Sequence, residues 1–414
     1  MPNIFQNLKN LKNFSQKVKI MFLPTQSKLD LFLSVLAQSR YGSINVKQNG
    51  KSIFSFVGEL PGPIAEINII NEKCLSDFFL RGDLGWAESY VDGNWETLNL
   101  TDFLEWGARN FHEFSRYVRG RWFTIFYLRL KHYLKNNTKS GSKKNISFHY
   151  DLGNSFYEKW LDKSMTYSSA MFKEPDDNLY KGQINKYENL AEITGIKKND
   201  KVLEIGCGWG GFSSFLAKNY SANVTAITIS KKQYEKASQK IFDEKLTEKV
   251  DVKLLDYRNI NGIYDKIVSI EMFEAVGEKY WSRYFEVLKK NLSPEGSIGL
   301  QTITIEDKFF QKYKKFPDFI QTYIFPGGML PSIEELNKVI ISKGMHIKNK
   351  KMFGNDYAKT LRYWSESFEN SWEYIKTLGF SESFKRLWNY YLGYCEGGFK
   401  SGNINVGQFL IKKG

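Results

Sequence analysis

Four glycines lie close together near the middle of this 414-residue chain, where their spacing suits ligand binding. They are Gly206, Gly208, Gly210 and Gly211, in the segment KVLEIGCGWGGFSSFLAKNY. The run before them reads as a buried strand, and the run after them reads as a helix. Glycine at such a turn lets backbone N–H groups and the helix N-terminus approach a ligand, because no Cβ intervenes. The segment therefore predicts a cofactor site.

The glycine pattern alone fits two classes of enzyme. Gly206, Gly208 and Gly211 satisfy the GxGxxG fingerprint of dinucleotide-binding dehydrogenases. A dehydrogenase would place Asp or Glu at the end of the next strand to bind the ribose diol, whereas NVTAITIS offers Thr228 and Ser230 there. This difference favours S-adenosylmethionine over a nicotinamide cofactor.

Two acidic residues at strand ends suit the same methyl donor. Glu204, just before the glycines, is better placed to meet a cationic amino-acid moiety than a pyrophosphate. Asp256, at the end of VDVKLLD, suits the adenine amino group, and its alternative role is that of a polar turn residue at a strand end. We therefore predict an S-adenosylmethionine-dependent methyltransferase.

The elements that must position these residues follow a regular order. Four apolar runs read as strands, with helices between them: KVLEIG, NVTAITIS, VDVKLLD and YDKIVSIEM. Strands that alternate with helices predict a parallel, doubly wound sheet. We expect residues 146–414 to form one α/β domain with the Rossmann-like fold of class I methyltransferases.

The residues before this domain predict a smaller α+β domain. LDLFLSVLAQ suits a helix, Asn49-Gly50 marks a hairpin turn, ELPGPIAEINII adds a strand, and later runs read as helices separated by glycine turns. KNNTKSGSKKN is polar and typical of a linker. We expect a basic tail over 1–28, a lipid- or membrane-associated domain over 29–134, and a linker over 135–145.

Composition limits the partners and the compartment. A formal net charge of +14 indicates an anionic partner, either nucleic acid or an anionic lipid surface. No apolar run is long enough to span a bilayer. The three cysteines are widely spaced and form no metal-ligand pattern, so we expect no metal site. We expect a cytoplasmic protein, peripheral at the inner face of the membrane, and leave open whether it forms a homodimer.

One stretch favours the lipid surface. Residues 116–144 contain nine Lys or Arg and no Asp or Glu, with aromatic and leucine side chains interleaved in the first half. Cationic side chains on one face and aromatics on the other suit a helix lying among anionic headgroups. The alternative is a solvated helix that packs its aromatics against its own protein.

Six ordered blocks resemble the cyclopropane-fatty-acyl-phospholipid synthase family, which is related to the mycolic acid cyclopropane synthases. The resemblance covers roughly residues 148–409, and the N-terminal domain is similar in kind to that of phospholipid-acting members. The blocks are HYDLGNSFYEKWLDKSMTYSSAMF, EIGCGWGG, IEMFEAVGEKYW, FIQTYIFPGGMLPS, DYAKTLRYW and YCEGGF. The resemblance implies that the enzyme uses S-adenosylmethionine to convert the double bond of an unsaturated phospholipid acyl chain to a cyclopropane ring.

The resemblance also assigns roles to individual residues. It implies methionine contacts from Tyr167 and Ser168, and a bicarbonate ion held beside the transferred methyl by a site that includes Glu274 and Tyr357. The residues expected at the cofactor are Tyr167, Ser168, Glu204, Gly206, Gly208, Gly210, Thr228, Ile229, Gln233, Asp256 and Tyr257. The residues expected at the reacting carbon are Glu274, Tyr357, Ser169, Gln301, Ile303 and Cys395.

The chemistry explains why such residues are needed. An alkene is a weak nucleophile, so it attacks the sulfonium methyl only when both are held in line without water. The product is a carbocation, which a carboxylate and aromatic faces can stabilise before a base removes a proton to close the ring. In the family that base resembles bicarbonate. Aromatic residues after Phe309 suit either an apolar acyl tunnel or ordinary core and lid packing.

Two positions depart from the family pattern. The usual YSC is Tyr167-Ser168-Ser169 here, and the usual His of an LHTI segment is Gln301. Serine and glutamine can donate hydrogen bonds, but glutamine cannot hold the proton. We therefore carry an alternative outcome, in which the cation loses a neighbouring proton and leaves a methyl-branched unsaturated chain.

Other functions are also considered. Methyltransferases that act on exocyclic amines of nucleic acids carry an (N/D)PP(Y/F) loop where this chain has SIEMFE, so we expect no nucleic-acid substrate. A non-catalytic lipid-binding protein is a second alternative, motivated by Ser169 and Gln301. Cys395 matches a cysteine once proposed as catalytic in the family, but its apolar surroundings favour an inert thiol. His149 suits a cofactor or lid contact, or a structural hydrogen bond.

Overall fold

The computed structural model describes residues 25–114 and 152–414. Within them the chain divides into two units, and each is treated by itself. The N-terminal unit contains 25–114 and Gly379–Asn403, and the larger unit contains 152–378 and Ile404–Gly414. The predictions for the basic tail up to residue 24, the basic stretch 116–144, the linker 135–145 and His149 lie outside the described residues.

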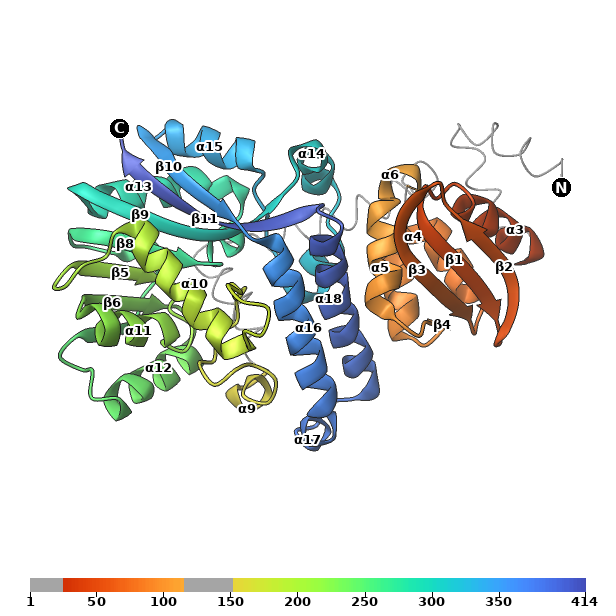
Figure 1. The fold of residues 1–414 in the computed structure, drawn as a ribbon, viewed down its shortest axis with the longest axis horizontal. Coiled ribbons are helices and arrows are strands. Elements are labelled where there is room, and N and C mark those ends of the chain that lie inside the picture. The colour runs from red at the N-terminus through yellow and green to blue at the C-terminus, as the bar shows by residue number, and fades with distance from the viewer. Residues whose placement is uncertain (1–24, 115–151) are drawn as a thin grey trace. The chain divides into compact units, whose positions relative to one another are not determined.

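The N-terminal unit is built on a small mixed sheet with strand order β2-β1-β3-β4 (Figure 1). β1 and β2 form the predicted hairpin, because Asn49 and Gly50 both adopt positive φ, at 48° and 81°. β3 pairs parallel with β1. The strands are β1 (Tyr41–Gln48), β2 (Lys51–Val57), β3 (Leu60–Ile69) and β4 (Trp95–Glu96).

Aromatic residues form much of the core of this unit. Trp95 stacks on Trp86 at 4.7 Å between ring centroids and lies 5.0 Å from the ring of Phe103. The second long helix is kinked at Gly82, whose φ of 67° and ψ of −142° are not helical. The helices before the gap are α3 (Thr25–Leu36), α4 (Lys73–Val91), α5 (Leu100–Arg109) and α6 (Phe111–Phe114).

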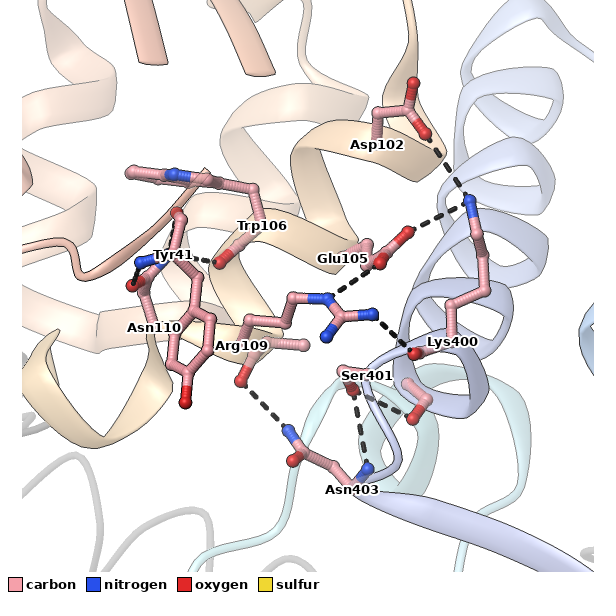
Figure 2. Close-up of polar contacts among 11 residues, drawn as sticks. Tyr41, Asp102, Glu105, Trp106, Arg109, Asn110, Lys400, Ser401 and Asn403 are labelled. Carbon is pink, nitrogen blue, oxygen red and sulfur yellow. Dashed lines mark hydrogen bonds and ion pairs between the residues drawn. The ribbon is translucent and has the colours of Figure 1, made fainter. Parts of the chain in front are cut away.

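A helix from near the C-terminus, α18 (Glu382–Lys400), completes the N-terminal unit (Figure 2). Glu105 on α5 accepts hydrogen bonds from Arg109 Nε at 2.8 Å and from Lys400 Nζ at 2.9 Å. Gly397 permits close packing, because a Cβ there would lie 2.7 Å from the backbone nitrogen of Glu105. The grouping of α18 with the N-terminal unit differs from the single continuous domain that was expected over 146–414.

The larger unit contains a seven-stranded sheet with order β10-β11-β9-β8-β5-β6-β7. Strands β5 to β9 pair in parallel, whereas β11 pairs antiparallel with both β9 and β10. The predicted α/β fold is confirmed. The strands are β5 (Lys201–Ile205), β6 (Asn223–Thr228), β7 (Val250–Leu254), β8 (Tyr264–Ile270), β9 (Leu292–Ile305), β10 (Met345–Met352) and β11 (Ile404–Lys413).

Helices bury both faces of this sheet (Figure 1). Successive residues of β5 point to opposite sides, so Val202 packs with α10 and α11 while Leu203 packs with α13 and α15. No helix in the described parts of the chain is both long and apolar enough to cross a membrane. The helices are α9 (Asn154–Tyr157), α10 (Leu179–Thr194), α11 (Gly211–Tyr220), α12 (Lys231–Asp243), η1 (Tyr257–Asn259), η2 (Phe273–Ala275), α13 (Glu278–Asn291), α14 (Asp307–Lys315), η3 (Ile320–Ile324), α15 (Ile333–Ile341), α16 (Gly354–Asn370) and α17 (Trp372–Thr377).

Candidate active site

The candidate site lies at the carboxyl ends of the central strands β5 and β8. From β5 the chain runs outward through β6 and β7, then returns to the other side of β5 to form β8 and β9. Doubly wound sheets bind ligands at such a reversal, outside the carboxyl ends of the strands. Gly206 follows β5 directly and Glu271 follows β8, so both lie at this edge.

The glycine loop has the geometry of a cofactor cradle. Gly206, Gly208 and Gly210 all have positive φ, at 83°, 53° and 83°. A Cβ on Gly206 would lie 2.8 Å from Cγ of Met272, whereas nothing lies within 4 Å of a Cβ built on Gly208. Because α11 begins at Gly211, its N-terminal N–H groups also face this end of the strand. The loop therefore fits the adenosyl methyl donor predicted from the sequence.

Glu204 is buried below this loop and ties β5 to α11. The Ser213 hydroxyl donates a hydrogen bond to its carboxyl group. Burial raises the pKa of Glu204 to about 7, against the opposing effects of Ser213 and Lys186. Its proposed contact with a cationic amino-acid moiety stays a prediction.

The predicted ribose and adenine neighbours lie at the carboxyl end of β6. The Thr228 hydroxyl donates to Oε1 of Gln233 at 2.8 Å, and both side chains are buried. Ser230 caps α12 by accepting a hydrogen bond from the backbone N–H of Gln233 at 3.3 Å. Ile229 lies between them and is half-buried. These contacts fix the first turn of α12 beside the end of β6.

Asp256 and Tyr257 follow β7, the next strand along the sheet. Nε and Nη2 of Arg258 donate to the two carboxylate oxygens of Asp256 at 2.8 and 2.6 Å. Tyr257 packs edge-on against Tyr284 at 5.2 Å, and burial raises its pKa to about 12. Asp256 is thus held in a fixed orientation by an ion pair that the sequence did not predict.

Tyr167 and Ser168 lie on a buried segment before α10. Ser168 Oγ accepts a hydrogen bond from Lys186 Nζ at 2.7 Å. Lys186 is fully buried, and this desolvation lowers its pKa to about 7 against the opposing charges of Glu271 and other carboxylates. The ring of Tyr167 packs against that of Trp364 at 5.2 Å. Lys186 was not predicted, because most lysines are exposed and its helix carries no motif.

Three of the predicted reacting-site residues converge on a residue that was not predicted, Glu271. Its Oε1 accepts hydrogen bonds from the Ser169 N–H at 2.9 Å and from Gln301 Nε2 at 2.7 Å. Its Oε2 accepts from the Tyr357 hydroxyl at 2.6 Å. Burial raises the pKa of Glu271, and all three donors and Lys186 oppose that rise. The sequence signal that could have identified Glu271 is its position directly after a central parallel strand.

Glu274 lies on η2, three residues further along. Its Oε1 accepts hydrogen bonds from the Thr302 hydroxyl at 2.9 Å and from the Ile303 N–H at 2.6 Å. Its Oε2 is buried and has no hydrogen-bond partner among the described residues. Burial, followed by the negative charge of Glu271, raises the pKa of Glu274 to about 8.

These contacts do not fit a separate bicarbonate ion on the predicted donors. Ser169, Gln301 and Tyr357 are bound to Glu271, and the Ile303 N–H is bound to Glu274. The remaining predicted residue, Cys395, lies half-buried on α18 in the N-terminal unit. Its expected place at the reacting carbon stays a prediction.

Known proteins match this chain over most of its length. The sequence model of the mycolic acid cyclopropane synthetase family matches residues 137–409. The cyclopropane-fatty-acyl-phospholipid synthase of Escherichia coli is 36% identical over 84% of this chain and 88% of that protein. The tuberculostearic acid methyltransferase UfaA1 of Mycobacterium tuberculosis is 34% identical over 81% of this chain and 80% of its own length.

A solved structure agrees with these sequence matches. The mycolic acid cyclopropane synthase CmaA1, crystallised with SAH and CTAB, superposes with a TM-score of 0.62 at 29% identity. It covers 66% of this chain and 98% of the CmaA1 chain. The matched family region contains both the glycine loop and the paired carboxyl groups. The chain therefore belongs to the mycolic acid cyclopropane synthetase family.

Proposed function

We propose that this S-adenosylmethionine-dependent C-methyltransferase adds a one-carbon unit to the double bond of an unsaturated fatty acyl chain in a phospholipid. The observation that carries the proposal is the buried pair Glu271 and Glu274 beside an open glycine cradle. Family membership supports the choice of substrate, because the E. coli relative is named as a fatty-acyl-phospholipid synthase.

The chain's own residues have distinct tasks in this reaction. S-adenosylmethionine supplies an electrophilic methyl group when it is bound. The cradle around Gly208 and the N-terminus of α11 orient it, while Ser168 and Tyr167 border its methionine part. A buried carboxylate stabilises the cation that forms on the acyl chain and accepts the proton that leaves. Exclusion of water matters because a cation beside water becomes an alcohol.

The main outcome is a cyclopropane ring, and a methyl-branched unsaturated chain is the second candidate. Gln301 supports the methyl-branched product, because its amide donates a hydrogen bond to Glu271 but cannot shuttle a proton. The names of the relatives also point to different products. One is a cyclopropane synthase and another is a tuberculostearic acid methyltransferase.

Part of the aromatic region expected to form an acyl tunnel packs in the core. Phe310 is buried and lies 6.2 Å from the ring of Trp281 in the hydrophobic cluster on one face of the sheet. Phe316, just after α14, is instead 40% exposed. We assign the acyl contact to the exposed end of this region.

We also expect the enzyme to work at an anionic membrane surface, since its formal net charge is +14. Sedimentation with vesicles should show more binding to anionic than to zwitterionic lipid, and the binding should weaken as salt rises. Equal binding to both vesicle types would contradict this expectation.

Product analysis tests the proposed function. The enzyme is incubated with unsaturated phospholipid vesicles and methyl-labelled S-adenosylmethionine, and the acyl chains are analysed by mass spectrometry. Both candidate products gain the mass of one methylene, so fragmentation and hydrogenation must distinguish them. A ring resists mild hydrogenation, whereas a branched alkene takes up hydrogen. Label in no acyl product would refute the proposal.

A further inference from the structure

The Glu271 side chain uses the hydrogen-bond donors that the family resemblance assigns to bicarbonate. Its two oxygens accept from Ser169, Gln301 and Tyr357, which come from three separate parts of the larger unit. A carboxylate is a planar oxyanion, as bicarbonate is, and the same N–H and O–H donors suit either. The protein therefore supplies its own anion at this position.

The backbone also holds Glu271 at this position. Its φ is 47°, in the left-handed region that favours glycine, and its N–H donates to the carbonyl oxygen of Gln301 at 2.8 Å. Both the main chain and the side chain of Glu271 are thus bound to Gln301. Non-glycine residues in this backbone conformation are typical of functional sites, and Glu271 lies at the edge of the sheet that carries the candidate site.

We propose that the Glu271 carboxylate replaces bicarbonate as the proton acceptor of this enzyme, so that turnover needs no added anion. The inference rests on the proposed function, because it names the base for that reaction. It also assigns Gln301 and Tyr357 to positioning this base.

The paired carboxyl groups differ in how well each accommodates a negative charge. Glu271 receives three hydrogen bonds, and the nearby Lys186 also favours its ionised form, whereas Oε2 of Glu274 has no hydrogen-bond partner among the described residues. Two neighbouring buried carboxyl groups do not readily ionise together. The proton therefore resides on Glu274, and Glu271 is the ionised partner that can accept a proton.

The proposed step balances without another reactant. The alkene electrons form a carbon–carbon bond to the methyl group as its bond to sulfur breaks, and sulfur keeps that electron pair. A positive charge remains on the other alkene carbon. For a ring, a C–H bond of the new methyl group breaks, its electrons close the third ring bond, and Glu271 takes the proton. For a branched alkene, Glu271 takes the proton from a neighbouring chain carbon instead.

The first test needs no variant. Methyl transfer to unsaturated phospholipid vesicles is measured with the full-length protein in CO2-free buffer, with and without added sodium bicarbonate. We expect the same kcat in both buffers. A several-fold stimulation by bicarbonate would overturn the inference while leaving the proposed function intact.

Two substitutions then separate a base from a structural carboxylate. Glu271→Gln keeps the size of the side chain but cannot accept the proton, so kcat should fall about 10²-fold or more with S-adenosylmethionine affinity retained. Glu271→Gly suits the left-handed backbone and leaves the three donors without their acceptor, so added bicarbonate should restore turnover. The exposed Glu295→Gln serves as the matched control with unchanged activity.

Binding of the ion gives a readout that does not depend on turnover. The carbon-13 NMR line of labelled bicarbonate should broaden with the Glu271→Gly protein and not with the wild type. Specific broadening with the wild type would overturn the inference, as would a Glu271→Gln enzyme with normal turnover. If the wild type methylated no unsaturated phospholipid in either buffer, the proposed function would fail, and the NMR comparison would still decide whether Glu271 occupies the anion position.

Discussion

Replacement of Glu274 by glutamine should change how stability depends on pH. Burial and the charge of Glu271 raise the pKa of Glu274 from 4.5 to about 8. At about 1.4 kcal/mol per pKa unit, the ionised side chain costs the folded state on the order of 3–5 kcal/mol. A neutral amide in the same place avoids that cost and can accept the Thr302 and Ile303 hydrogen bonds through its carbonyl oxygen.

The sign of the effect follows from proton binding. Between pH 4.5 and about 8 the folded state keeps a proton on Glu274 that the unfolded state has released. The contribution of Glu274 to the free energy of unfolding is therefore fully present below pH 4.5 and is lost as the pH rises to about 8. Glu274→Gln should lack this loss, so the variant becomes more stable relative to the wild type as the pH rises.

Urea unfolding from pH 5 to 8.5, followed by circular dichroism, measures this difference. Glu204 and Lys186 also make the free energy of unfolding depend on pH. Both proteins contain them, so their effects largely cancel when the wild-type stability curve is subtracted from that of the variant. The exposed Glu295→Gln should run parallel to the wild type. A stability difference between Glu274→Gln and the wild type that stayed constant over this range would refute the assignment of a raised pKa to Glu274.

Three further substitutions test the glycine cradle, the packing of α18 and the electrostatic role of Lys186. Gly208→Val should abolish S-adenosylmethionine binding in calorimetry, because its side chain enters the open cradle, whereas Gly402→Val carries a similar positive φ and should bind normally. Gly397→Ala should lower the free energy of unfolding by about 1–3 kcal/mol in a thermal melt, because the new Cβ would lie 2.7 Å from the backbone nitrogen of Glu105. Gly393→Ala, whose Cβ would lie 3.3 Å from a methyl group of Leu104, should be neutral or stabilising in the same assay. Lys186→Met should move the acidic limb of the pH profile of kcat/KM to higher pH, since loss of the cation makes the buried carboxylate harder to ionise; an unmoved limb would contradict this role.

Local sequence signals identified the elements around the cofactor. The run before Gly206 is the predicted strand, the helix after it ends at Tyr220 as expected, and the next helix begins at Lys231. The hairpin turn at Asn49 and Gly50 is also confirmed. In each case the signal lies within a few residues, in glycine spacing or in an apolar run, so no long-range contact is needed to read it.

The parts that sequence analysis missed depend on contacts between distant residues. Lys186 becomes buried through the segment that contains Ser168, and Glu271 acquires its partners from β9 and α16. The assignment of α18 to the N-terminal unit rests on contacts such as that of Lys400 with Glu105 (Figure 2). A linear pattern shows that such residues exist, but not which of them meet.

The central claim is that this chain methylates an unsaturated acyl chain and uses its own carboxylate as base. The most direct measurement is mass spectrometry of acyl chains after incubation of the wild-type enzyme with unsaturated phospholipid vesicles and methyl-labelled S-adenosylmethionine in CO2-free buffer. We predict that labelled acyl chains gain the mass of one methylene at the same rate as in buffer with bicarbonate. Absence of labelled acyl chains, or their formation only when bicarbonate is added, would contradict the claim.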